Sequence, residues 1–154
     1  MADPEPRWNL IVPSVHRLEL PWQIFGMYVP VNVYLVSDAS GTHFSLIDTG
    51  LAEHAPTLIP LLHEKIGNGS LDFVLITHGH LDHAGGLRFV MEAFPSCTAV
   101  IQKAERPFIC DRKLFREIRG ESMCSPFSCF KSCLKELALN VRPTESLVCV
   151  ISRL

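Results

Sequence analysis

A cluster of histidines within residues 77–86 constrains the fold of this chain most strongly. Three of the seven histidines, His78, His80 and His83, fall within six positions of the segment THGHLDHAGG. An apolar run over residues 71–76 precedes the cluster and predicts a buried strand, and apolar residues at helical spacing follow it at positions 87, 90, 91 and 94. The cluster is therefore expected on a strand-to-helix turn, a rigid place to hold a metal site.

The spacing within this cluster suits metal binding. His78 and His80 are two residues apart, so in an extended turn their side chains leave on the same side and can converge on one ion. Asp82 and His83 follow a bend and can reach a second ion. Imidazole and carboxylate ligands favour Zn, Fe or Mn over Ca or Mg. A solvated polar loop with chance histidines is the alternative, and the tight clustering argues against it.

Two segments of the chain resemble motifs of a known family. Residues 78–83, HGHLDH, resemble the H-x-H-x-D-H signature of the metallo-β-lactamase superfamily, and residues 45–50, SLIDTG, resemble its first motif, a strand that ends in Asp-x-Gly. The resemblance covers residues 14–107. It implies that His78 and His80 bind a first metal and that Asp82 and His83 bind a second. Asp82 is also the candidate catalytic residue.

The resemblance further implies that Asp48 supports the metal ligands from behind, as a partner that orients them. The alternative for Asp48 is an ordinary turn at the end of a strand. A complete family site also needs a third histidine, a bridging aspartate and a last histidine, all downstream. The chain has no histidine after His83, and its only later aspartate is Asp111. Four ligands for two ions fall short of the three protein ligands per catalytic zinc that are usual.

An α+β fold is expected, namely the N-terminal αβ half of a metallo-β-lactamase αββα sandwich. The sheet should be mixed and mostly antiparallel, with helices on one face. The chain is expected to divide into a lead-in (1–13), a partial domain (14–110) and an irregular, basic tail rich in Cys and Ser (111–154). Strands are expected at 8–12, 15–20, 31–36, 43–48, 71–77, 98–102 and 147–151, and helices at 57–66, 84–94, 111–119 and 131–139.

Several further predictions concern single residues. Pro21 should close the second strand, so that residues 22–28 form a loop. Pro60 should lie in the first turn of its helix. His43, His54 and His63 are expected on the surface rather than at a site. Cys124, Cys129 and Cys133 lack the C-x-x-C spacing of a structural zinc site, and the cysteines are expected as free thiols.

Charge and hydropathy narrow the range of partners. Residues 1–110 carry a net charge of −5 and residues 111–154 carry +3, so the half with the histidine cluster lacks the basic footprint of a nucleic-acid enzyme. No apolar run reaches the length of a membrane helix. The acidic, proline-rich start is unlike a signal or transit peptide, which favours a cytoplasmic location.

Two functional hypotheses follow. The first is a metal-dependent hydrolase with one or two zinc ions, or Fe or Mn instead, in which metal-bound hydroxide attacks a small ester, thioester, lactone or amide. The second is a truncated, catalytically silent isoform that retains half of the metal site. It would act by pairing with another chain, in a homo- or hetero-oligomer, through the sheet face that its helices leave uncovered.

Overall fold

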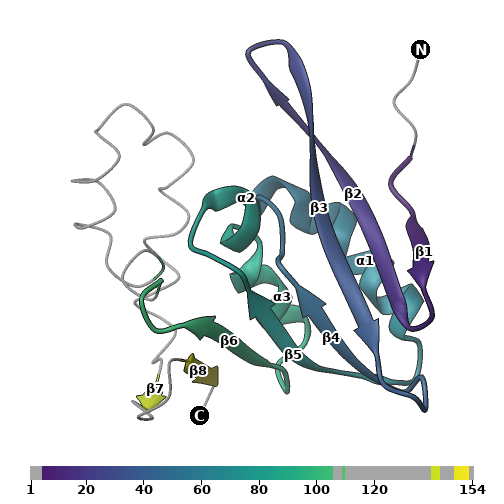
Figure 1. The fold of residues 1–154 in the computed structure, drawn as a ribbon, viewed down its shortest axis with the longest axis vertical. Helices are drawn as coiled ribbons and strands as arrows, with labels where there is room; N and C mark the ends of the chain where they lie inside the picture. Colours follow the sequence, from purple (N-terminus) through teal and green to yellow (C-terminus); the bar gives the residue numbers. More distant parts are fainter. Residues whose placement is uncertain (1–4, 106–108, 110–139, 143–147, 153–154) are drawn as a thin grey trace.

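The computed structural model describes residues 5–105, 109, 140–142 and 148–152. Within these ranges the chain forms one eight-stranded sheet with the order β1-β2-β3-β4-β5-β6-β8-β7 (Figure 1). Strands β4, β5 and β6 run parallel and the other neighbours are antiparallel, so the expected mixed, mostly antiparallel sheet is confirmed. The strands are β1 (Trp8–Val12), β2 (Val15–Ile24), β3 (Met27–Ser37), β4 (His43–Ile47), β5 (Ser70–Ile76), β6 (Thr98–Gln102), β7 (Asn140–Arg142) and β8 (Val148–Ser152).

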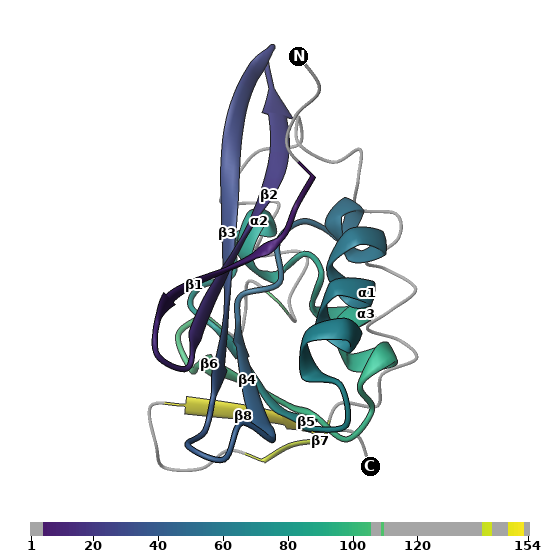
Figure 2. The ribbon, with the colours of Figure 1, turned by 90° about the vertical axis from the view of Figure 1, so that its right-hand side faces the viewer.

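The two longer helices lie on one face of this sheet, as expected (Figure 2). The two longer ones are α1 (Ala55–Ile66) and α3 (Leu87–Ala93), and the short helices η1 (Ala52–His54) and α2 (Leu81–Ala84) precede them. Leu58, Leu62 and Ile66 recur every four residues along α1, so they share one face of the helix, and all three are buried. None of the helices in the described residues is both long and apolar enough to cross a membrane.

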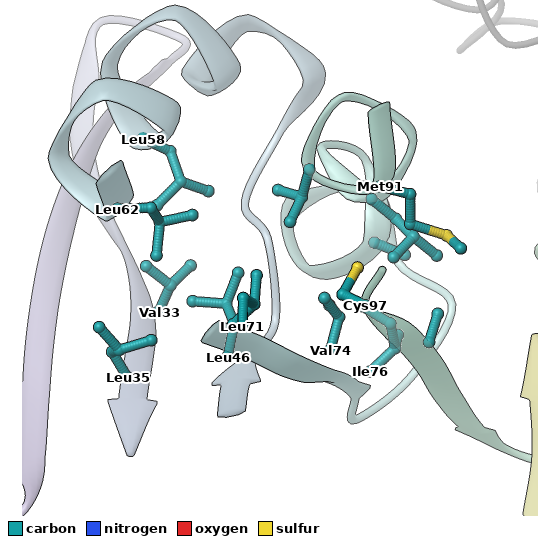
Figure 3. Close-up of a cluster of buried hydrophobic side chains, with 14 of the residues drawn as sticks. Val33, Leu35, Leu46, Leu58, Leu62, Leu71, Val74, Ile76, Met91 and Cys97 are labelled. Atoms are coloured by element: carbon teal, nitrogen blue, oxygen red, sulfur yellow. The ribbon is translucent and has the colours of Figure 1, made fainter. Parts of the chain in front are cut away.

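The core lies between the helices and the sheet (Figure 3). Leu58 and Leu62 of α1 point toward the side chains of β3, β4 and β5, and Met91 of α3 covers the β5 side of the same layer. Side chains alternate along a strand, so a strand contributes every second residue to this layer, except in β5, where the register shift beside β4 puts Leu71 and Val74 on the same face. The buried members from the sheet are Leu18, Leu20, Val31, Val33, Leu35, Phe44, Leu46, Leu71, Val74, Ile76, Ala99 and Ile101.

The opposite face of the sheet has no helix over it in the described part of the chain. Tyr34, Ile47, Leu75 and Val100 are in register across β3, β4, β5 and β6, and they alternate with core residues, so they share this helix-free face. Phe73, two residues before Leu75, lies on the same face. Phe73 keeps 45% of its surface exposed and Leu75 keeps 36%, which are high values for large apolar residues in central strands.

The prediction of a loop at residues 22–28 is wrong. Strands β2 and β3 form one long hairpin that turns at Phe25 and Gly26. Both turn residues have positive φ, 50° and 76°, as a two-residue hairpin turn requires. Pro21 does not end β2, since it lies opposite Pro30 in the ladder. Counting from the turn, this pair occupies a position where backbone N–H groups point away from the partner strand, so proline removes no hydrogen bond there.

The helices also differ from expectation. The helix expected over 84–94 is two helices, because the chain breaks at Gly85 and Gly86 between α2 and α3. Helix α1 begins at Ala55, with a proline at its first positions, so Pro60 lies inside the helix rather than in its first turn. Proline has no backbone N–H, so Pro60 cannot donate a hydrogen bond within the helix. Its exposed position on the surface of α1 is compatible with this loss.

Part of the tail is regular rather than irregular. Strand β8 pairs antiparallel with β6, and β7 pairs with β8, so both extend the edge of the sheet. The strand expected at 147–151 is confirmed, shifted by one residue. The helices expected at 111–119 and 131–139, and the cysteines at 124, 129 and 133, lie outside the described residues. The division into 1–13, 14–110 and 111–154 stays a prediction.

Candidate metal site

The histidine cluster lies at the edge of the sheet where the parallel strands β4, β5 and β6 end. Residues 77–80 connect β5 to α2, as the sequence predicts, and Asp82 and His83 are on the first turn of α2. Carboxyl ends of parallel strands meet at one edge of a sheet, which is where ligand sites form in such folds. The residues after β4 and after β6 therefore flank the cluster on its two sides.

Tight backbone packing fixes α2 against the loop after β4. The Thr49 backbone N–H donates to the His83 carbonyl at 2.7 Å, and the Gly86 N–H donates to the Gly50 carbonyl at 2.9 Å. A Cβ atom at Gly86 would collide with the Thr49 carbonyl oxygen, and one at Gly85 would collide with the Leu81 carbonyl oxygen and crowd the backbone of Leu51 and Ala52. The two glycines are therefore required for this close approach, which accounts for the break between α2 and α3.

Asp48 is the buried carboxylate of the site. It follows β4 in the left-handed region, with φ of 60°, which Asp tolerates better than most residues. One oxygen accepts from the Thr77 backbone N–H at 2.8 Å, and the Thr77 hydroxyl donates to the carboxylate as well. The other oxygen lies 2.7 Å from Nδ1 of His83. Asp48 thus ties the start of the turn to the histidine at its end.

The three histidines of the cluster come together in the structure. The ring centre of His78 lies 4.5 Å from that of His80 and 4.1 Å from that of His83. The structure therefore brings the three predicted ligands together, and their binding of metal stays a prediction. His78 and His83 are partly buried, whereas His80 is exposed.

The geometry of Asp82 and His83 fits two ligands of one metal ion. Nδ1 of His83 faces Asp48, so Nε2 is the nitrogen that can bind a metal, and it lies 3.4 Å from Oδ2 of Asp82. Two ligands at 2.0–2.2 Å from a tetrahedral zinc are about 3.3 Å apart. A histidine whose other nitrogen donates to a carboxylate is also the usual arrangement around protein-bound metals.

The ligand set is nevertheless incomplete in the described part of the chain. Across residues 5–105, 109, 140–142 and 148–152, no group of three His, Cys, Asp or Glu side chains is arranged to hold an ion. Two imidazoles that share a tetrahedral zinc hold their ring centres about 5 Å apart. The 4.1 and 4.5 Å separations around His78 are shorter, so these rings must move apart to share an ion.

His54 contradicts the sequence expectation of a surface residue. It is buried, with 5% of its surface exposed. The Leu51 backbone N–H donates to its Nδ1 at 3.1 Å, and its Nε2 donates to the Pro21 carbonyl at 2.9 Å. This pairing attaches the loop after β4 to strand β2. The residue follows the first motif by only four positions, but its burial depends on β2, which is distant in sequence.

His43 and His63 are on the surface, as expected. His43 forms a small polar cluster with Ser70 and Asp72 at the far ends of β4 and β5, where its Nδ1 lies 2.8 Å from the Asp72 carboxylate. The Ser70 hydroxyl, and then His43, lower the pKa of Asp72. Ser70 approaches the same nitrogen of His43 that faces Asp72. A serine nucleophile instead needs the opposite nitrogen of its histidine, so this cluster is not a catalytic triad.

Sequence reasoning did not identify Glu105, which directly contacts residues 77–80, the turn that carries the predicted ligands (the metal turn). Its Oε2 atom accepts a hydrogen bond of 2.9 Å from the backbone N–H of Gly79, between His78 and His80. Glu105 lies just beyond β6, on a turn closed by a bond from its own N–H to the Gln102 carbonyl. The sequence feature that could have pointed to Glu105 is its position directly after β6. That β6 is the neighbour of β5 becomes known only from the strand order of the sheet.

Comparison with known proteins places these features in a family. A family model described as the metallo-beta-lactamase superfamily matches residues 27–138. The probable metallo-hydrolase YflN of Bacillus subtilis is 28% identical over 102 residues, which are 64% of this chain and 38% of that protein. An uncharacterised protein of the same organism, YobT, is 29% identical over 93 residues, 59% of this chain and 38% of that protein. The chain thus spans well under half of the length of these curated relatives.

Solved structures show the same fold over most of the described chain. A metallo-beta-lactamase from Pontibacter korlensis matches with a TM-score of 0.61 at 20% identity, over 70% of this chain and 48% of that one. The metallo-beta-lactamase FIM-1 from Pseudomonas aeruginosa, solved in a mono-zinc form, matches with a TM-score of 0.57 at 16% identity, over 69% and 46% of the two chains. At these identities the match describes the fold.

Proposed function

This chain belongs to the metallo-β-lactamase superfamily, and we propose that it is a metal-dependent hydrolase of a small ester, thioester, lactone or amide. Family membership implies a divalent metal, often zinc, and Fe or Mn would suit the same ligands. The observation that carries the proposal is His83 held between two carboxylates, with Nδ1 on Asp48 and Nε2 facing Asp82.

Each residue of the cluster has a distinct part in this proposal. His78 and His80 would hold a first ion, and Asp82 and His83 a second. When bound, such ions lower the pKa of a water molecule and stabilise negative charge on the attacked carbonyl oxygen. Asp48 keeps the proton on Nδ1 of His83, which leaves Nε2 available as a ligand. The carboxylate of Asp82, about one-third exposed, can accept a hydrogen bond from the attacking water and orient it.

The test begins with elemental analysis of protein purified through gel filtration, followed by turnover of an aryl ester, a thioester and a lactone. We expect bound metal and hydrolysis of one of these substrates, and loss of both in His80→Ala. His63→Ala is the matched control, because His63 is an exposed histidine on α1 that stacks on Phe94. Metal-free protein, or turnover that His80→Ala leaves unchanged, would contradict the proposal.

A second candidate function rests on the helix-free face. Phe73 and Leu75 are exposed there, and an apolar sheet face of this kind favours a partner. In this alternative the chain is catalytically silent and acts by pairing with another chain. Light scattering should then give a mass above that of one chain, and Leu75→Lys should return it to one chain. An active monomer would contradict this alternative.

Three further expectations from the sequence stay predictions. They are a small-molecule substrate, the absence of nucleic-acid and membrane partners, and a cytoplasmic location.

A further inference from the structure

Two carboxylates hold the metal turn, one from each side. The backbone N–H of Thr77 donates to Asp48, which follows β4, and that of Gly79 donates to Glu105, which follows β6. Strand β5 lies between β4 and β6 in the sheet, so the carboxylates approach its end from its two neighbours. Asp48 belongs to the first family motif, whereas Glu105 belongs to neither motif.

Residues 77–80 lack strand or helix structure, so their backbone N–H groups need partners outside the regular hydrogen-bond ladders. Gly79 is buried, and its N–H would lack a protein partner if Glu105 were absent. A hydrogen bond from a backbone N–H to an ionised carboxylate is stronger than one between neutral groups. The bond fixes the orientation of the peptide that joins His78 to Gly79, and this peptide lies between the two histidines of the turn.

The position of Glu105 is itself fixed. The bond from its N–H to the Gln102 carbonyl closes a turn directly after β6, and β6 pairs in parallel register with β5. Glu105 forms no Lys or Arg ion pair with any described residue. Its carboxylate is therefore directed to the turn rather than to a surface cation.

We propose that Glu105 is a positioning residue of the metal site, which acts through the backbone of Gly79 to hold the main chain of the turn in the shape from which the His78 and His80 side chains can reach a metal. The inference rests on the proposed function, because it assigns these histidines to a metal. Glu105 is not itself a ligand here. It acts as Asp48 does, from the opposite side of the turn and through the main chain.

The experiment compares Glu105→Ala, which removes the acceptor, with Glu105→Gln, which keeps an acceptor oxygen but removes the charge. Glu64→Gln is the matched control, on the exposed surface of α1. Two quantities are measured: amide hydrogen exchange of Gly79 in metal-free protein, and Co²⁺ affinity together with the visible absorption spectrum of the Co²⁺ complex. Urea unfolding checks that each variant is folded.

We expect Gly79 to exchange at least tenfold faster in Glu105→Ala, and Co²⁺ to bind about tenfold more weakly with an altered spectrum. Glu105→Gln should recover most of both properties, and Glu64→Gln should match the wild type. Unchanged Gly79 exchange in Glu105→Ala would overturn the inference, as would faster exchange with unchanged Co²⁺ affinity and spectrum. Wild-type protein that binds no Co²⁺ would instead overturn the proposed function and the affinity claim with it. The Gly79 exchange would still decide whether Glu105 holds the turn.

Discussion

The carboxylate of Asp48 lies 2.7 Å from Nδ1 of His83, although 35 positions separate the two residues in the sequence. The contact joins the end of β4 to helix α2, across the end of β5. It keeps the proton of the histidine on Nδ1 and directs Nε2 toward Asp82. Because Asp48 also accepts the Thr77 N–H, one buried carboxylate contacts both the start of the turn and His83, a predicted metal ligand.

Replacement of Asp48 by Asn should weaken metal binding. Asparagine tolerates the positive φ of this position, so the backbone is not newly strained. Its neutral amide no longer stabilises a proton on Nδ1 of His83, and loss of such partners typically weakens metal affinity about 10–100-fold. Zinc titration against a chromophoric competitor measures the change. Asp72→Asn, on a half-exposed carboxylate at the other end of β5, is the control, and equal affinities in the two variants would refute the prediction.

Replacement of Gly86 by Ala should destabilise the fold. The added methyl group would collide with the Thr49 carbonyl oxygen, a backbone atom that cannot rotate away. Overpacking of this kind lowers the free energy of unfolding by about 1–3 kcal/mol. Urea denaturation measures the loss. Gly41→Asn serves as the control, because Gly41 has open space around it and a positive φ that Asn accepts. A similar midpoint for both variants would show that the close approach is not required.

Replacement of His54 by Phe should also lower the free energy of unfolding. The phenyl ring fills a similar volume but leaves the Leu51 N–H and the Pro21 carbonyl without partners. A buried polar group left unpaired costs about 1–3 kcal/mol. His63→Phe is the control, since that exposed ring stacks on Phe94 and phenylalanine preserves the stacking. The prediction fails if chemical denaturation gives the two variants the same stability.

The turn before β4 should show a strongly acidic carboxyl group. The Ser40 hydroxyl, followed by the backbone N–H of His43, lowers the pKa of Asp38 from 3.8 to about 2. A lowered folded-state pKa means that this group stabilises the fold fully above pH 3.8, and that its contribution is lost as the pH falls toward 2. An NMR titration of Asp38 should give a midpoint near 2, and Ser40→Ala should raise it. A midpoint unaffected by Ser40→Ala would assign the shift to other causes.

Periodicity and motif spacing predicted the elements that depend on local sequence. The strand before the histidines, the apolar face of α1 at Leu58 and Leu62, and the strand before the Asp48 motif are all found, although β4 ends one residue earlier than predicted, at Ile47. Each is encoded within one window of apolar residues. The β2–β3 hairpin was missed, because prolines are harmless only at specific ladder positions, and those positions depend on the pairing of Pro21 with Pro30.

The sequence alone determined that His78, His80, Asp82 and His83 gather on one turn, because they are neighbours along the chain, and it predicts them as the metal ligands. Only the tertiary structure decided what holds that turn. Asp48, Glu105 and His54 make their decisive contacts with residues 26–35 positions away. Such contacts arise from the order in which β4, β5 and β6 lie side by side and from the path of β2. Strand order is a property of the packed sheet, and no single segment of the sequence contains it.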